Sequence, residues 1–394
     1  MSQKVINHNP DLKRLRDEGY CIEISPGNFL LVKGVPYVNS KKEIAEGTLI
    51  SNLTMAGGKT APPDPHVVHF IGDQPCHANG TEIAQIKHPN GETKLDEGLV
   101  ANRSFSFMLD GGYPDYFVKM DTYVNILTNA ARAIDLTANA KKFLPVASTE
   151  DDSPFLYFDT ASSRAGITAV TRKLELSKVA IVGVGGTGSY ILDLVAKTPV
   201  NEIHLFDADK FLSHNAFRAP GAASLAELEA LPTKVAYLTN QYSRMRRRVI
   251  PHEYFIDGSN VDQLREMNFV FLSLDKGKSK RIIVERLQEW NIPFVVVGMG
   301  VVLVDDALVG TLRVTTSSEK KTDHVLGKNR IAHSDEDGED IYAENIQIAD
   351  LNALNAALAV IKWKKHFGFY GYIEDEHYAE YVISGNHMNN EDCP

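Results

Sequence analysis

The chain has few cysteines, no long apolar run and no excess of positive charge. Its 394 residues include only Cys21, Cys76 and Cys393, and no two of these form a C-x-x-C pair. This spacing argues against a disulfide framework and a four-cysteine zinc site, and it favours the reducing cytoplasm. The longest apolar run, 292–304, contains a proline and two glycines and is too short to span a bilayer. A net charge of −10 disfavours binding to nucleic acid or to an anionic membrane.

At this length the chain can form two domains, each with its own core. Residues 1–145 combine short apolar strands, a turn-rich stretch and one amphipathic helix around Phe117–Ala131, so we expect a small α+β domain. The acidic stretch 146–158 is predicted to be a linker. A second domain is expected over 159–385, and the polar residues 386–394 are expected to form a flexible tail.

The second domain alternates between apolar strands and amphipathic helices. The expected strands are 179–182, 202–206, 269–274 and 294–297, with an antiparallel segment at 308–315 and an apolar helix at 346–367. Alternation of this kind predicts an α/β fold with a Rossmann-like, doubly wound parallel sheet. In such sheets the ligand lies at the carboxyl ends of the strands.

A glycine-rich turn follows the first of these strands in the sequence Val-Gly-Val-Gly-Gly-Thr-Gly. Its glycines allow backbone N–H groups and a helix N-terminus to face the anionic part of a nucleotide; they are Gly183, Gly185, Gly186 and Gly188. Asp207 ends the next strand, where an acidic side chain commonly accepts the ribose hydroxyls. The loop alone is also compatible with a Rossmann-like fold that binds another nucleotide or none, and Asp207 alone is equally typical of a strand-end cap.

Polar residues after Asp207 narrow the interpretation. Asn215 and Arg218 follow it, then Lys234, and Asp275 comes after the third apolar strand. A hydride-transferring dehydrogenase does not need these amide, cationic and acidic side chains. An enzyme that binds a triphosphate together with a metal does need them. Asp275 before Lys-Gly is also compatible with a simple turn. The basic cluster 244–248 follows a helical segment, where cations are ordinary, so it does not indicate nucleic-acid binding.

Taken together, these motifs resemble the adenylation domain shared by ubiquitin-activating enzymes and the ThiF/MoeB-type activators of sulfur carriers. The resemblance covers about residues 160–315 and the C-terminal helix. It implies an enzyme that binds ATP and Mg²⁺ and adenylates the C-terminal glycine of a ubiquitin-like protein. Such chemistry brings two anions together, so the site needs cations and a metal but no general base.

The resemblance also implies a role for each matched residue. The four glycines form the nucleotide loop, Asp207 binds the ribose, and Asp209 is the second acid of that motif. Asn215 and Arg218 contact the phosphates, Lys234 neutralises developing charge, and Asp275 binds the metal. Arg164 corresponds to an arginine that reaches the partner's ATP site across a homodimer, as an arginine finger does.

The chain departs from the family where an acyl group would be transferred. No cysteine lies between Cys76 and Cys393, although relatives that form a thioester carry one in the loop after the sheet, here 314–328. Thr316 and Ser317, within 315–318, offer hydroxyls there, and these would need activation. Cys76 is the other possible acyl acceptor, because His69 or His77 could lower its pKa. The alternative is that Cys76 is a buried structural residue.

The wider arrangement resembles bacterial ThiF-family proteins that carry an extra N-terminal domain. That resemblance implies a bacterial, often antiphage, ubiquitin-like conjugation system with a conjugating-enzyme-like partner. We therefore expect the N-terminal domain to recruit the carrier or that partner. The alternatives are an adenylyltransferase of the same fold that acts on a small substrate or peptide, and a non-catalytic nucleotide-binding scaffold. An NAD oxidoreductase ranks below both.

Overall fold

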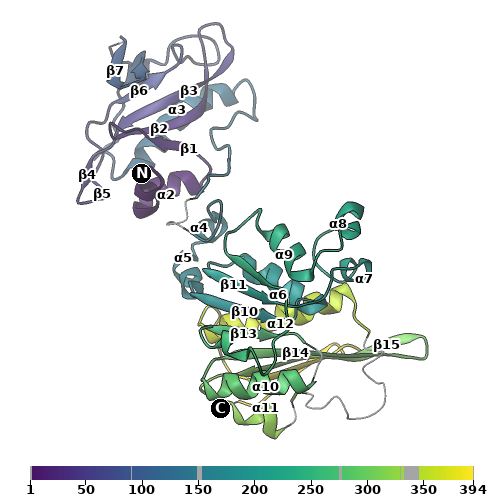
Figure 1. Cartoon of the computed structure of the whole chain (residues 1–394). Coiled ribbons are helices and arrows are strands. Elements are labelled where there is room, and N and C mark those ends of the chain that lie inside the picture. Colours follow the sequence, from purple (N-terminus) through teal and green to yellow (C-terminus); the bar gives the residue numbers. More distant parts are fainter. Residues whose placement is uncertain are drawn as a thin grey trace. The chain divides into compact units, whose positions relative to one another are not determined.

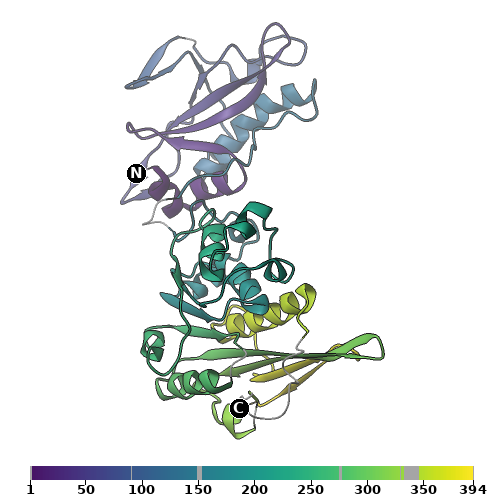
Figure 2. The ribbon, with the colours of Figure 1, turned by 45° about the vertical axis from the view of Figure 1, so that its right-hand side comes forward.

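The computed structural model describes residues 2–89, 91–148, 153–274, 277–328, 330–331 and 346–393. The chain divides into two compact units. The N-terminal unit comprises Met1–Ser148 and Phe158–Gly166, and the C-terminal unit comprises Thr149–Tyr157 and Ile167–Pro394. Figure 1 and Figure 2 show the chain from two directions. Within the described residues, none of the helices has the length and apolar character needed to cross a bilayer.

The N-terminal unit is an α+β structure built on a five-stranded antiparallel sheet in the order β1-β2-β3-β6-β9. Helix α3 packs on β2 and β3 and buries its apolar side against them, Met120, Val124 and Leu127 included. The elements of this unit are α1 (Ser2–His8), α2 (Pro10–Asp17), β1 (Cys21–Ile24), β2 (Phe29–Val38), β3 (Ile44–Asn52), β4 (Met55–Ala56), β5 (Lys59–Thr60), β6 (Val68–Ile71), η1 (Ala84–Ile86), β7 (Thr93–Asp96), β8 (Leu99–Ala101), β9 (Arg103–Phe105), α3 (Tyr116–Arg132) and α4 (Ala161–Arg164).

The C-terminal unit is organised around an eight-stranded sheet in the order β12-β11-β10-β13-β14-β15-β16-β17. The first five strands in this order, from β12 through β11, β10 and β13 to β14, pair in parallel. The strands from β14 through β15 and β16 to β17 pair antiparallel. The strands are β10 (Lys178–Val182), β11 (Glu202–Phe206), β12 (Val249–His252), β13 (Phe269–Leu272), β14 (Phe294–Val304), β15 (Ala307–Ser317), β16 (Tyr378–Val382) and β17 (His387–Glu391). The predicted doubly wound α/β fold is confirmed.

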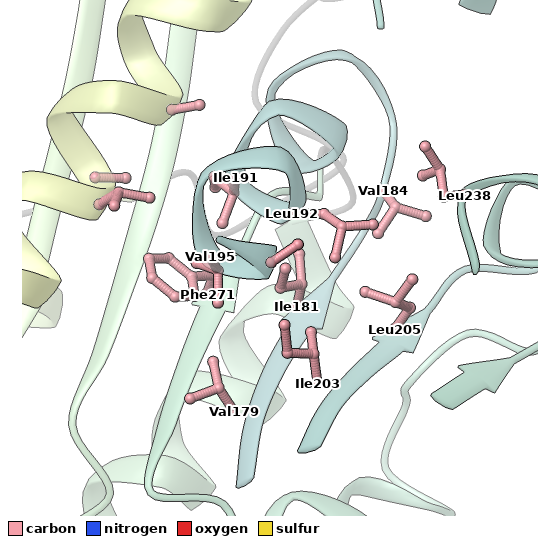
Figure 3. Packing of buried hydrophobic residues seen from close by; sticks show 14 of the residues in the cluster. Val179, Ile181, Val184, Ile191, Leu192, Val195, Ile203, Leu205, Leu238 and Phe271 are labelled. Atoms are coloured by element: carbon pink, nitrogen blue, oxygen red, sulfur yellow. The ribbon is translucent and has the colours of Figure 1, made fainter. Parts of the chain in front are cut away.

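Helices cover both faces of the parallel strands because these strands are apolar on both sides. On one face α6 and α12 enclose a core that includes Val179, Ile181 and Ile191, part of which is drawn in Figure 3. On the other face α10 and α11 bury residues such as Ile283 and Val325. The helices of this unit are α5 (Thr168–Thr171), η2 (Arg172–Leu174), α6 (Gly186–Ala196), α7 (Ser213–Ala216), α8 (Leu225–Glu229), α9 (Lys234–Tyr242), η3 (Val261–Leu264), α10 (Gly277–Glu289), α11 (Asp323–Gly327) and α12 (Ala349–His366).

Two predicted boundaries differ from the structure. Part of the expected linker joins the C-terminal unit, because Arg247 N donates to Pro154 O and Leu156 N donates to Met245 O. Residues 158–166, in contrast, belong with the N-terminal unit. The expected flexible tail is wrong for residues 387–391, which form the edge strand β17 and pair with β16 along its whole length.

Candidate functional site

A cavity of about 230 Å³ opens at the carboxyl ends of β10, β11 and β13, where a doubly wound sheet is expected to hold its ligand. The wall includes residues from the glycine loop, from the ends of three strands and from the segment leading into α12. Among them are Gly183, Gly185, Gly186, Thr187, Asp207, Asp209, Lys234, Ser273, Gly298, Gln347 and Asn355. Three of the four predicted glycines, Gly183, Gly185 and Gly186, therefore line one cavity together with Asp207 and Asp209.

The four loop glycines are required for different reasons. Gly183 has φ of +84°, and a Cβ there would lie 2.1 Å from Ser273 O. A Cβ on Gly188 would lie 2.0 Å from Gly183 O, and one on Gly186 would lie 2.2 Å from Asn352 Nδ2. Only Gly185, the residue before α6, faces open space with no atom within 4 Å. Three glycines thus serve close packing, and Gly185 leaves room at the helix N-terminus for an anion.

Asp207 is a buried carboxylate, only 4 % exposed, that connects the glycine loop to the next loop. Its Oδ2 accepts a hydrogen bond from Val184 N at 2.9 Å, and its Oδ1 accepts one from Asp209 N, also at 2.9 Å. A carboxylate oxygen can accept more than one hydrogen bond, so Asp207 can hold both backbone segments and still receive a hydroxyl from the cavity. These contacts show the strand-end role, and the binding of a ribose by Asp207 stays a prediction.

Lys234 is the first residue of α9, and its side chain is 11 % exposed. A cation at a helix N-terminus opposes the helix dipole, so it requires anions close by. Asp209 supplies one at 2.7 Å from Nζ, and Asp207 Oδ1 lies at 3.7 Å. Because the Asp209 side chain is 57 % exposed, its ion pair is open to exchange with an anionic ligand in the cavity.

Arg218 reaches the cavity through a neutral partner, whereas Asn215 does not line it. Arg218 donates from Nε to His214 O at 3.2 Å and from Nη1 to the Gln347 amide oxygen at 3.3 Å. Gln347 is part of the cavity wall. Asn215 is 6 % exposed, and its Oδ1 accepts from Leu212 N at the start of α7. Its described contact is therefore structural.

Helix α12 contributes two buried asparagines that were not among the predicted site residues. Asn352 Oδ1 accepts from the Thr187 hydroxyl at 2.9 Å, which holds the start of α6. Asn355 lines the cavity, and its Nδ2 donates to Gly298 O at 3.0 Å. Its buried Oδ1 has no hydrogen-bond partner within the part of the chain that the structure describes. Two asparagines three residues apart in an apolar helix are the signal that could have identified this edge of the site.

Two predicted residues lie apart from this geometry. Asp275, the predicted metal ligand, is outside the described residues. Arg164 belongs to α4 of the N-terminal unit, where its guanidinium carbon lies 4.9 Å from the ring centre of Phe143. Across the described ranges, no three histidine, cysteine, aspartate or glutamate side chains are grouped so that they could hold a metal.

The predicted hydroxyl acceptors do not lie in a loop. Thr316 and Ser317 belong to β15, each is 2 % exposed, and Ser317 pairs with Phe294 at the start of β14. The cavity adjoins Gly298, four residues further along that strand, which corresponds to about 13 Å. The expectation of an accessible acceptor loop is therefore wrong for these residues. Central strand pairing buries them.

Cys76 is also buried, at 2 % exposure, and its Sγ donates to Gln74 O. Burial, together with the carboxylate of Glu82, raises the pKa of the Cys76 thiol. The predicted lowering of this pKa by His69 or His77 is therefore wrong. The structure supports the alternative of a structural cysteine, because thiolate formation is disfavoured where the thiol is desolvated.

Comparison with known proteins gives two family matches. A model described as the ThiF family matches residues 161–322, and one described as a domain of unknown function, DUF6791, matches residues 10–160. Ubiquitin-like modifier-activating enzyme 5 of Aedes aegypti is 33 % identical over 93 residues, which are 21 % of this chain and 23 % of the relative. The same enzyme of Drosophila virilis is 30 % identical over 125 residues, 30 % of each chain. The chain thus spans less than a third of these relatives.

Solved structures with a similar fold include PaaA and the E. coli enzyme MccB. PaaA is 18 % identical, with a TM-score of 0.44 over 57 % of this chain and 75 % of that chain. The microcin C7 biosynthetic enzyme MccB in complex with N-formylated MccA is 16 % identical, with a TM-score of 0.46 over 59 % of this chain and 69 % of that chain.

Proposed function

Residues 161–322 form a ThiF-family domain, and from this premise we propose that the chain is an ATP-dependent adenylyltransferase. Its substrate is the C-terminal glycine carboxylate of a ubiquitin-like protein. The observation that carries the proposal is the cavity itself, where the open loop at Gly185, the buried Asp207 and the cation Lys234 face one another. The sequence relatives that are named as ubiquitin-like modifier-activating enzymes support this substrate class.

The reaction joins two anions, and this sets what the site must supply. A carboxylate oxygen of the substrate forms a bond to the α-phosphorus of ATP, and the bond from that phosphorus to the bridging oxygen breaks as pyrophosphate leaves. The carboxylate is already ionised at neutral pH, so no proton has to be removed. The barrier is lowered by positive groups around the phosphates. The α6 N-terminus and Lys234 line the cavity, and Arg218 contacts Gln347 in its wall, so these groups would supply that charge.

Lys234 has a specific part in this proposal. Its ammonium is held by Asp209, whose side chain is 57 % exposed, and by the buried Asp207. A phosphate that enters the cavity competes with Asp209 for the same ammonium, while Asp207 keeps the lysine in place. The exchangeable ion pair with Asp209 therefore keeps the Lys234 ammonium close to where the phosphates would bind, and leaves it free to contact them.

Further parts of the proposal follow the family resemblance. Mg²⁺ would neutralise charge on the phosphates, and Asp275 would be its protein ligand. The enzyme would act as a homodimer to which Arg164 contributes across the interface, and the N-terminal unit would recruit the carrier or a conjugating-enzyme-like partner.

The test is ATP–pyrophosphate exchange by the purified chain, with and without a glycine-terminated ubiquitin-like protein, followed by the intact mass of that carrier. We expect carrier-dependent exchange and an AMP adduct on the carrier. Arg218→Ala should abolish both, whereas the control Lys197→Ala, an exposed lysine paired with Asp193 on α6, should not. Exchange that needs only a peptide or small acid would indicate the small-substrate alternative. ATP binding without exchange by any of these substrates would indicate the scaffold and refute the proposal.

A further inference from the structure

Strand β14 leaves the parallel part of the sheet and continues into a hairpin with β15, which extends outward in Figure 1 and Figure 2. Gly298 and Gly300 are two residues apart on β14, so they face the same side of the hairpin. The residues directly opposite them on β15 are Arg313 and Thr311. A glycine inside a strand commonly marks a place where another backbone or a ligand approaches closely.

Arg313 leans over the first of these glycines. A Cβ built on Gly298 would lie 3.6 Å from Arg313 Nε and 3.8 Å from its Nη2. Glu380 lies opposite Arg313 on the other neighbouring strand, yet no ion pair joins the two side chains within the described ranges. Instead, the buried Nε of Arg313 has no hydrogen-bond partner in the described residues. A buried charged donor without a partner is costly, so Arg313 is placed to receive an anion.

The site of this unpaired donor adjoins the cavity. Gly298 is part of the cavity wall, and its carbonyl accepts the hydrogen bond from Asn355. Asn355 is fully buried, lines the same cavity and carries the unpartnered Oδ1 described above. Two residues that adjoin Gly298, Arg313 and Asn355, therefore carry a donor and an acceptor without partners in the described residues.

Further from the cavity, beyond Gly300, the same side of the hairpin carries apolar residues. Val302 and Val304 continue the alternation from Gly300, with Val309 and Ala307 opposite them. Val302 is 42 % exposed and Val304 is 46 % exposed. Along one side of β14 the order is thus exposed valines, an open glycine, and then a glycine under an arginine next to the cavity.

We infer that Arg313 binds the terminal carboxylate of the substrate, whose extended C-terminal tail lies along Gly300 and ends at Arg313, beside Gly298. The inference rests on the proposed function and specifies how that substrate enters. The ligand class is a peptide C-terminus with small last residues, because its backbone must lie close to a strand that has no side chains there. A guanidinium suits this task because it pairs with a carboxylate through two parallel hydrogen bonds.

This assignment separates the cations of the site by function. Lys234 and Arg218 serve the phosphate side, where negative charge leaves with pyrophosphate. Arg313 serves the carboxylate side, where it holds the nucleophile before attack and takes no part in bond making. It should therefore govern the KM for the acyl substrate more than the affinity for ATP.

The first experiment compares Gly300→Val and Arg313→Ala with wild type in carrier-dependent ATP–pyrophosphate exchange. No atom lies within 4 Å of a Cβ on Gly300, and valine favours strands, so Gly300→Val should fold normally while obstructing the tail. Each variant should raise the KM for the carrier roughly tenfold or more with unchanged ATP affinity, Arg313→Ala through loss of a charge-assisted contact and Gly300→Val through obstruction of the tail. Arg313→Lys should restore part of the loss.

The matched controls are Gly371→Val, an equally open glycine elsewhere in the unit, and Arg281→Ala, an exposed arginine paired with Glu285. Neither control should change the KM for the carrier. If wild type shows exchange but Gly300→Val and Arg313→Ala keep its KM, the inference is wrong although the proposed function stands. If wild type shows no exchange with any acyl substrate, the proposed function itself has failed.

A second experiment measures binding without reaction. A synthetic peptide ending in Gly-Gly is prepared as the free acid and as the amide, and each is titrated into the protein by calorimetry. Wild type should prefer the acid about tenfold, because only the acid presents a carboxylate to Arg313. Arg313→Ala should bind both forms within twofold. A preference for the acid that survives in Arg313→Ala would overturn the assignment.

Discussion

The replacement Asp207→Asn should destabilise the C-terminal unit even when no nucleotide is bound. The carboxylate accepts one hydrogen bond on each oxygen, from Val184 N and from Asp209 N, and it is buried. An asparagine offers only one oxygen, so its amide group must face one of the two backbone N–H groups. That N–H becomes a buried donor without an acceptor, and the remaining bond loses its charge assistance.

The size of the effect follows from these contacts. An unsatisfied buried donor costs about 1–3 kcal/mol, and the change from a charged to a neutral acceptor adds about 1 kcal/mol, so we expect a loss of roughly 2–4 kcal/mol. For a unit of this size each kcal/mol lowers the melting temperature by about 2–4 °C, which predicts a decrease of roughly 4–16 °C.

Tryptophan fluorescence is the appropriate assay, because both tryptophans of the chain, Trp290 and Trp363, lie in the C-terminal unit. Thermal melting is followed without nucleotide for wild type, Asp207→Asn and the control Asp209→Asn. Asp209 has a more exposed side chain and loses mainly an ion pair, so its variant should lose no more than about 1 kcal/mol. A wild-type melting temperature for Asp207→Asn, combined with lost ATP binding, would refute the role of Asp207 in holding the two backbone segments together.

Three further outcomes are expected. Gly188→Ala should lower the free energy of unfolding of the C-terminal unit by more than about 1–3 kcal/mol, because its methyl group meets a backbone oxygen. Gly185→Ala should have the wild-type melting temperature and bind ATP more weakly. Iodoacetamide should modify the exposed Cys393 of the native protein and reach Cys76 only after denaturation; rapid native alkylation of Cys76 would contradict its burial. Burial lowers the pKa of His324, so below about pH 6.5 the unfolded chain binds a proton that the folded chain does not, and stability falls with falling pH. The loss should not exceed about 1.4 kcal/mol per pH unit for this group, and melting that is independent of pH between 7.5 and 5.5 would count against it.

The parallel half of the large sheet was predictable because its strands are apolar on both faces. Strand β11 has the bounds that were predicted for it, 202–206, and β10 differs by one residue. Local patterns identify such strands, since burial on both sides leaves little else that the sequence could form. The antiparallel half was only partly predictable. The polar stretch Thr316–Ser317 was interpreted as a loop, yet threonine is β-branched and pairing with β14 and the segment before β16 buries it.

The candidate site was predictable where one segment supplies it and not where distant segments meet. The glycine loop, Asp207 and Lys234 lie along a familiar spacing, and the structure brings them to one cavity. Asn355 lines that cavity, and Arg313 lies beside Gly298 in its wall, only because α12 and β15 pack against this strand, and no local pattern records these contacts. Cys76 shows the converse, since neighbouring histidines suggested activation but burial decides its pKa.

The different reasons for the loop glycines have a consequence for how this kind of domain diverges. Gly183, Gly186 and Gly188 are held by contacts within the fold, so selection for folding alone preserves them. Gly185 borders open space, so no contact with the described residues requires its small size, whereas a ligand at the helix N-terminus would. In descendants that lose catalysis but keep the fold, substitutions should therefore accumulate at position 185 first. The other loop glycines would persist after the activity is lost, and the residue at position 185 would distinguish an active domain from an inactive one.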